Sequence, residues 1–285
     1  MNIRNIFFSF IFLALIAVAA VAQTKSFAIQ SAASYVTYDE PAGTFPLGGN
    51  AVASLYPING NFDTINGQAY NCDAAAPAFQ GRCGGVRVFV VSEFQFEGNF
   101  FAVYAPVSYA SPTQINFVMP YLPIFTGQYQ IQIGNDAGLE RIRTGIWLED
   151  RSLQPFVEYQ NINGVIRPML RGSLYGYTVS GGTITGAVFL KSLTDGVPNP
   201  RTYNGLPTII QAYYSGGQSV GGSVYTFYNG SLFGVLPIVD NSYPGVSLVN
   251  IEINGIGTWD AGVQSLRLNY ISQWVKTEAF VHFAN

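Results

Sequence analysis

The sequence predicts an all-β protein: two tandem immunoglobulin-like β-sandwich domains that follow a cleaved signal peptide. The first observation is that 31 Gly and 15 Pro interrupt the chain at short intervals. After residue 22, only three segments of twelve or more residues contain neither residue type: 23–40, 86–97 and 263–285. Helices of about 11 residues therefore have little room. The second is strict alternation of apolar and polar residues, and the third is turn chemistry between the alternating segments.

The amino terminus predicts export. Arg4 precedes an apolar run from Ile6 to Val18, and Ala20-Val21-Ala22 supplies the small residues that a signal peptidase recognises. We therefore predict a signal peptide over residues 1–22 and a mature chain that starts at Gln23. The alternative, an uncleaved membrane anchor, requires a span of about 20 residues, which is longer than this run. No later segment is apolar enough for a transmembrane helix, so we expect a secreted, extracellular or cell-surface protein.

The strands follow from the period of two. In each of four segments, every second residue is apolar, which places the apolar set on one face of a sheet. In chain order, the apolar sets are Ile115, Phe117 and Met119; Tyr129, Ile131 and Ile133; Val249, Ile251 and Ile253; and Leu266, Leu268 and Tyr270. Turns are predicted at four sites rich in Gly or in Asn followed by Gly: Gly134–Gly138, Asn163-Gly164, Gly216-Gly217 and Asn229-Gly230. One buried and one solvated face indicate antiparallel sandwiches.

Four landmarks recur along the chain at spacings of 133 to 137 residues. The pairs are Gly48-Gly49 with Gly181-Gly182, Gly84-Gly85 with Gly221-Gly222, Ile115-Asn116-Phe117 with Val249-Asn250-Ile251, and Gly127 with Gly262. Their shared order indicates two homologous domains of about 130 residues, a common domain size. A cluster of charges with a proline at 149–155 predicts the joint, which gives domains at 23–152 and 153–285.

Three motifs carry a resemblance to a known family: Ser31-Ala-Ala-Ser-Tyr35, Gly84-Gly85-Val86-Arg87-Val88, and the segment from Tyr109 to Pro120. The chain resembles uncharacterised bacterial secreted domains of the TIG-type immunoglobulin-like class, whose motifs read NAAS, GGVxV and SPxQINFxVP. Gln154-Pro155-Phe156 is similar to the family's closing segment. The likeness covers most of residues 31–156 and is fainter over 157–285; Ser31 replaces the usual Asn, and the loop between the two cysteines resembles an insertion.

This resemblance implies a β-sandwich without known catalysis. It also implies a structural role for the residues that match the central motif, which are Ser111, Pro112, Gln114, Asn116 and Pro120.

Cys72 and Cys83 are the two cysteines of the chain. In an oxidising compartment two cysteines most simply form one disulfide, and a closed loop of this length stabilises a fold by about 3 kcal/mol on the chain-entropy model. The alternative, a reactive thiol pair, lacks the CxxC spacing and a helix that would lower a thiol pKa. The sequence therefore predicts a structural Cys72–Cys83 bridge.

Catalytic and cofactor chemistry find little support. Gly217-Gln-Ser219-Val-Gly221, followed by Asp240 or Asp260 and by His282, matches the hydrolase pattern, yet the residues after Ser219 read as a strand where the mechanism needs a helix. One His cannot build a His-rich metal site. With 13 Lys+Arg against 16 Asp+Glu there is no basic footprint for nucleic acid. We expect no enzyme, no cofactor and no nucleic-acid partner.

Two features suggest non-catalytic binding. Tyr213, Tyr214, Tyr225 and Tyr228 could form an aromatic surface for sugar stacking or a protein interface. The alternative is that a chain with only 10% charged residues places Tyr on half-exposed sheet faces. The second feature is the first strand, predicted over 23–35, whose Phe27 and Ile29 could insert into the sheet of a neighbouring molecule. Its alternative is pairing within its own domain.

These features predict a non-catalytic structural or adhesive cell-surface protein. Its expected partner is another copy of the chain or another surface protein, and strand addition through Phe27 and Ile29 would make it a filament subunit. Two alternatives stay open: an extracellular carbohydrate-binding module with polysaccharide as its partner, and an outer-membrane β-barrel, against which the repeat and the frequent prolines argue.

Overall fold

The computed structural model describes residues 27–38, 47–73, 82–96, 99–120, 127–149, 153–180, 183–198, 208–216, 223–228, 231–252, 262–270, 273–274 and 279–284. Most of them lie in β-strands, and their helical segments are two 3-10 turns, η1 (Ile65–Gly67) and η3 (Leu193–Asp195). The predicted all-β fold is confirmed. Within this part of the chain no helix has the length and apolar character of a membrane span. The predicted signal peptide, residues 1–22, lies outside it.

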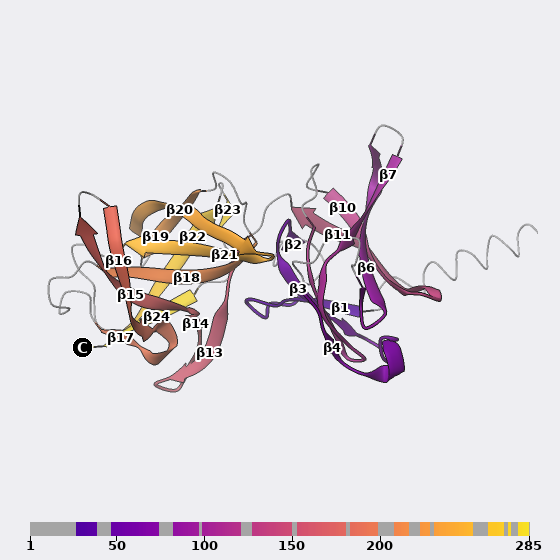
Figure 1. The fold of residues 1–285 in the computed structure, drawn as a ribbon, viewed down its shortest axis with the longest axis horizontal. Coiled ribbons are helices and arrows are strands. Elements are labelled where there is room, and N and C mark those ends of the chain that lie inside the picture. Colours follow the sequence, from indigo (N-terminus) through magenta and orange to yellow (C-terminus); the bar gives the residue numbers. More distant parts are fainter. Residues whose placement is uncertain are drawn as a thin grey trace, which may run out of the picture. The chain divides into compact units, whose positions relative to one another are not determined.

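The first two sheets come from the amino-terminal half of the chain (Figure 1). Sheet A has the strand order β1 (Phe27–Ser31), β3 (Val52–Pro57), β9 (Gln114–Val118), β8 (Val107–Ser111) and β4 (Tyr70–Asn71). Sheet B has the order β2 (Leu47–Gly48), β11 (Gly138–Glu149), β10 (Gly127–Asn135), β6 (Val86–Phe96) and β5 (Arg82–Cys83), and β7 (Asn99–Ala105) pairs with β6.

The predicted alternation is confirmed where sheets A and B face each other. Tyr129, Ile131 and Ile133 of β10 are buried, whereas Gln128 is exposed and Gln130 half-buried. Burial of apolar side chains on facing sides is the main stabilising contribution of a sandwich. The buried set is Phe27, Ile29, Leu55, Ile115 and Phe117 from sheet A and Val86, Val88, Val90, Ile131, Ile133 and Leu148 from sheet B.

Strand β1 ends at Ser31, four residues earlier than the predicted end at residue 35. The hydroxyl of Ser31 accepts the backbone N–H groups of Ala33 and Ser34 at 3.2 and 3.1 Å. A side chain that binds N–H groups two and three residues ahead competes with strand pairing and closes a turn. Tyr35 completes this turn with a φ of 59° and donates its N–H to the Ser31 carbonyl at 3.0 Å.

Ser111 closes the turn between β8 and β9 in the same way. Its hydroxyl accepts the N–H groups of Thr113 and Gln114 at 3.3 and 3.0 Å. Pro112, which lies between Ser111 and Thr113, accepts a hydrogen bond on its carbonyl from the N–H of Phe62 at 2.7 Å. The serine and proline of the central motif therefore shape a turn and hold a neighbouring loop against it.

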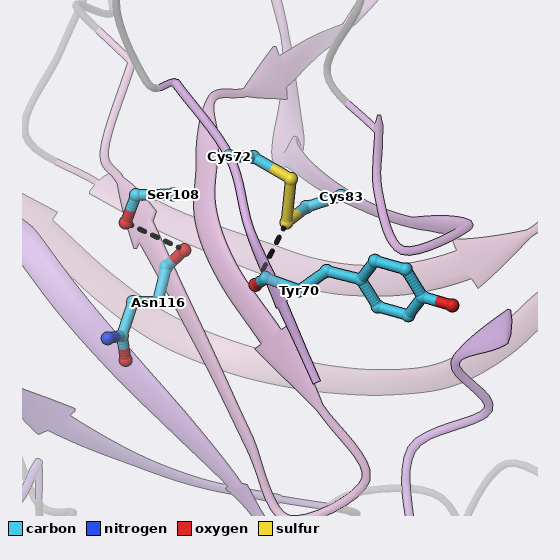
Figure 2. Close-up of a disulfide and its surroundings, with 5 residues drawn as sticks. All are labelled: Tyr70, Cys72, Cys83, Ser108 and Asn116. Carbon is cyan, nitrogen blue, oxygen red and sulfur yellow. Dashed lines mark hydrogen bonds between the residues drawn. A yellow bond between two sulfur atoms is a disulfide. The ribbon is translucent and has the colours of Figure 1, made fainter. Parts of the chain in front are cut away.

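Asn116 connects three strands through its two oxygen atoms. The side-chain oxygen accepts hydrogen bonds from Gln114 Nε2 at 2.7 Å and from Ser54 Oγ of β3 at 2.8 Å. The backbone carbonyl accepts one from Ser108 Oγ of β8 at 3.4 Å (Figure 2). Pro120, which ends the motif, is half-buried just after β9. Through these hydrogen bonds, Gln114 and Asn116 of the motif help to connect the strands of sheet A.

The predicted disulfide is confirmed: Cys72 follows β4 and Cys83 ends β5, with Cα atoms 5.8 Å apart (Figure 2). Because β4 belongs to sheet A and β5 to sheet B, the bond connects the two sheets. The Cys72 N–H donates to the Ser108 carbonyl at 2.8 Å, and Cys83 Sγ lies 3.5 Å from the Tyr70 carbonyl oxygen.

The glycines after Cys83 form the two-residue loop of the β5–β6 hairpin. Gly84 and Gly85 have φ values of 55° and 84°, and Cys83 pairs with Val86 across them. Two consecutive residues with positive φ define a turn that matches the twist of a hairpin and that glycine adopts without strain. A Cβ atom at Gly84 would also overlap the ring of Tyr70.

The remaining strands form one long sheet (Figure 1). Its order is β13 (Val157–Ile162), β14 (Val165–Leu170), β24 (Ala279–Ala284), β22 (Gly262–Tyr270), β19 (Ser223–Tyr228), β20 (Ser231–Tyr243), β21 (Val246–Glu252), β18 (Thr208–Gly216), β15 (Gly172–Ser180) and β16 (Thr183–Ser192). Three short strands attach to it: β12 (Leu153–Pro155) to β18, β17 (Val197–Pro198) to β24 and β23 (Gln273–Trp274) to β22.

Strand β20 joins the two halves of this sheet. Its first residues pair with β19 and its last ones with β21. Side chains from both halves meet in one core, which includes Leu170, Leu174, Leu193, Ile210, Val249, Ile251, Leu266, Val281 and Phe283. Ile253, Leu268 and Tyr270, which were predicted to continue the apolar sets, lie outside the residues whose side chains are described.

The chain divides into two compact units. Unit 1 comprises Met1–Ile29, Ser54–Phe117 and Thr126–Leu148, and unit 2 comprises Gln30–Ala53, Val118–Phe125 and Glu149–Asn285. The predicted domains, residues 23–152 and 153–285, and their homology stay predictions.

Candidate binding cavity

Of the two tyrosines of the predicted aromatic surface whose side chains the structure describes, Tyr213 lies at a cavity and Tyr214 does not. The cavity lies in unit 2 and has a volume of about 410 Å³. This volume falls in the range of about 300–1,000 Å³ that small-molecule sites occupy. Its lining residues are Phe156, Glu158, Arg171, Gly172, Ser192, Thr194, Tyr213 and Val246.

Three of the lining residues are joined through their backbones. Phe156 donates its N–H to the Tyr213 carbonyl at 3.0 Å, Tyr213 donates to the Arg171 carbonyl at 3.2 Å, and Arg171 donates to the Phe156 carbonyl at 2.8 Å. Phe156 lies between β12 and β13, Arg171 between β14 and β15, and Tyr213 within β18. This closed ring of hydrogen bonds fixes the bases of two aromatic rings and one guanidinium around the cavity.

Gly172 allows these backbones to approach each other. A Cβ atom at this position would overlap the carbonyl oxygen of Gln211 and would lie 3.0 Å from both Ala212 Cα and Leu193 Cδ1. Because backbone atoms cannot move away as a flexible side chain can, only a residue without a Cβ fits here.

Tyr213 and its neighbour Tyr214 point to opposite faces of β18. Ile210, Ala212 and Tyr214 are buried, whereas Tyr213 is 38% exposed. The prediction that Tyr214 contributes to an exposed aromatic surface is therefore wrong, because its side chain is 1% exposed and belongs to the core. Tyr225 and Tyr228 lie in β19, and their side chains are outside the described residues.

Burial raises the pKa of the Tyr214 hydroxyl above its ordinary value of 10.0. In the unfolded chain this hydroxyl ionises near pH 10, so alkaline solution stabilises the unfolded state. The neutral, buried Tyr214 hydroxyl therefore contributes its full stability below pH 10. This contribution is lost as the pH rises above 10, because the hydroxyl ionises in the unfolded chain but not in the folded one. Relative to the variant Tyr214→Phe, we expect the wild-type free energy of unfolding to fall by about 1.4 kcal/mol more between pH 9 and pH 11. Urea denaturation at both pH values measures this difference, and equal losses in the two proteins would contradict it.

The cavity is lined by charged side chains as well as by aromatic rings. Glu158 of β13 and Arg171 are both exposed, and within the described part of the chain neither side chain has a hydrogen bond or an ion pair. Ser192 Oγ and Thr194 Oγ1 share a hydrogen bond of 2.9 Å, and Gln160 Nε2 donates to the Thr194 carbonyl at 3.1 Å. A carboxylate, a guanidinium and two hydroxyls therefore surround the two rings.

Most of this site has no counterpart among the sequence predictions. Phe156 belongs to the closing segment of the family resemblance, and no sequence prediction points to Glu158, Arg171, Ser192 or Thr194. Arg171 beside Gly172 was the available signal, because a charged residue between two strands, next to a glycine, indicates a tightly packed and exposed turn.

None of the other predicted positions that the structure describes lines the cavity. Phe27 and Ile29 are fully buried in β1. Ser219 and Asp260 of the hydrolase alternative lie outside the described residues, as does the side chain of Asp240, and His282 is half-buried in β24. Among the described residues no group of three or more His, Cys, Asp or Glu side chains could hold a metal ion.

Comparison with known proteins adds no assignment. No family model matches the chain, and no curated protein sequence matches it.

Proposed function

We propose that the chain is a non-catalytic, exported structural or adhesive protein whose copies assemble by exchange of β1. We also propose that the chain is related to the secreted immunoglobulin-like domains that it resembles and that residues 1–22 are removed as a signal peptide. Two findings support it in outline: the all-β fold and a disulfide of the kind that persists in oxidising compartments.

The position of β1 carries the proposal. This strand is at the edge of sheet A, and β3 is its neighbour in the sheet order. Beyond this pairing, the described part of the chain adds an isolated bridge between Gln30 and Thr37. Phe27 and Ile29 are nevertheless fully buried, so an edge strand near the amino terminus supplies part of the core. The same place can be filled by β1 of a second copy, since exchange of an identical element makes the same contacts between molecules.

A second uncharged edge supports self-association. Strand β7 pairs with β6, contains no charged residue and exposes Phe100 and Tyr104. Folded proteins usually protect such edges with charges or prolines, so an unprotected apolar edge indicates a contact surface.

The oligomeric mass of the mature chain, residues 23–285, tests the proposal. Light scattering after size exclusion should show a series of oligomers that grows with concentration, because the proposed filament is a head-to-tail assembly that does not close into a ring. An excess of a peptide with the sequence of residues 23–31, added during refolding, should shorten the series. The same peptide with Phe27→Asp and Ile29→Asp should not. A chain that stays monomeric at every concentration, or a single closed dimer, would overturn filament assembly.

The cavity favours a second candidate function, the binding of polysaccharide. It places the exposed ring of Tyr213 beside Phe156 and a set of polar side chains, which is the combination that sugar binding needs. Retardation of the mature chain in gels that contain polysaccharide tests this function, and migration that no polysaccharide alters would contradict it.

A further inference from the structure

We propose that the cavity lined by Tyr213 binds a neutral saccharide, with Tyr213 and Phe156 stacking on the sugar and with Glu158 and Arg171 hydrogen-bonding its hydroxyls. This inference rests on the second candidate function and names its site and ligand class.

The two rings come from residues whose backbones are directly bonded. The hydrogen bond of 3.0 Å from the Phe156 N–H to the Tyr213 carbonyl keeps the bases of the two side chains together. Phe156 is half-buried and Tyr213 is 38% exposed, so each side chain is partly packed and partly accessible to a ligand. The apolar C–H face of a sugar ring packs on such aromatic surfaces, while its hydroxyls point outward.

The hydrogen-bonding groups complement hydroxyls. The Glu158 carboxylate only accepts hydrogen bonds, and the Arg171 guanidinium only donates them. Each sugar hydroxyl can both donate and accept a hydrogen bond. Neighbouring hydroxyls can therefore donate to the Glu158 carboxylate and accept from the Arg171 guanidinium. Neither side chain has a hydrogen bond or an ion pair within the described part of the chain, so binding there replaces no such interaction.

Charge favours a neutral ligand. Among the described residues that line the cavity, the charged ones are Glu158 and Arg171, whose formal charges cancel. An anion approaching Arg171 meets the repulsion of Glu158, and a cation approaching Glu158 meets that of Arg171. A neutral polyhydroxyl compound gains from both.

The backbone argues against an extended peptide as the ligand. Peptides in extended form bind mainly through main-chain hydrogen bonds to free backbone groups. Here the N–H and carbonyl groups of Phe156, Arg171 and Tyr213 are all used in their mutual ring of hydrogen bonds. Recognition at this place therefore depends on side chains, as it does for sugars.

Calorimetric titration of the mature chain tests the inference, with neutral oligosaccharides built from glucose, galactose, mannose or N-acetylglucosamine. For a sugar that binds, Tyr213→Ala should weaken affinity at least about tenfold, because one stacked ring is lost. Tyr213→Phe should keep affinity within about threefold, since the ring remains. Glu158→Gln and Arg171→Gln should each weaken binding. Phe189→Ala, which removes a ring that is 57% exposed on β16, is the matched control and should have no effect.

The outcomes separate the site from the function. Full binding in Tyr213→Ala would keep saccharide binding but overturn the cavity as its site. Preference for an acidic polysaccharide, with affinity that falls as salt rises, would overturn the neutral ligand. If no sugar and no polysaccharide binds, both the inference and the second candidate function fail.

Discussion

Replacing Phe27 with alanine is expected to lower the free energy of unfolding by about 3–5 kcal/mol, the range for truncation of a fully buried phenylalanine. The side chain is 0% exposed and packs in the core between sheets A and B. The loss has two parts: the apolar surface that is no longer buried, and the cavity that the remaining core cannot fill. The backbone of residue 27 stays bound, since Arg143 Nη1 donates to its carbonyl at 3.0 Å.

Urea denaturation of the mature chain, followed by tryptophan fluorescence, measures this loss. Phe100→Ala is the matched control, because Phe100 is 60% exposed on β7 and its truncation should change stability by less than about 0.5 kcal/mol. If both variants lose the same small amount, Phe27 is not a core residue and the placement of β1 is wrong.

The same variant separates folding from assembly. In Phe27→Ala the place of β1 is only partly filled, so a wild-type peptide of residues 23–31 should compete for it better than in the unaltered chain. We expect the peptide to bind the variant during refolding more tightly than it binds the wild type. A peptide that binds neither protein would indicate that β1 is not exchanged.

The fold was predictable because its signals are local. An alternation such as that of Tyr129, Ile131 and Ile133 needs only neighbouring residues, and one residue of displacement would expose the whole set. The pairing of Cys72 with Cys83 was equally accessible, since the chain has no other cysteine. Ser31 shows the limit of this reasoning: its hydroxyl ends the strand, although the apolar pattern alone continues past it.

The cavity was not predictable because it is assembled from separate strands. Phe156, Arg171 and Tyr213 come from three places in the chain, and the backbone ring that joins them exists only after β12, β14 and β18 have met. The error at Tyr214 was avoidable. Ile210 and Ala212 already define the buried face of β18, and the period of two assigns Tyr214 to it and Tyr213 to the opposite face.

Removal of the Cys72–Cys83 bond is the second change with a large expected effect: the double variant Cys72→Ala, Cys83→Ala should lose about 3 kcal/mol of unfolding free energy. The bond closes a sequence separation of 11 residues and so restricts the unfolded chain. It also joins β4, an edge of sheet A, to β5, an edge of sheet B, where β4 is only two residues long. So short a strand has few hydrogen bonds with β8 to hold it without the bond.

The two sulfur atoms can be separated without mutation, which gives the test its control. Wild-type protein treated with a reductant and the double variant should show the same loss, whereas the reductant should not change the double variant at all. Because β4 depends on the bond, hydrogen exchange should rise first at Tyr70 and Cys72, whose backbone groups pair with β8. Exchange that instead rises evenly through sheet A would show that the bond stabilises the fold only by restricting the unfolded chain, and unchanged stability in both proteins would show that it contributes nothing.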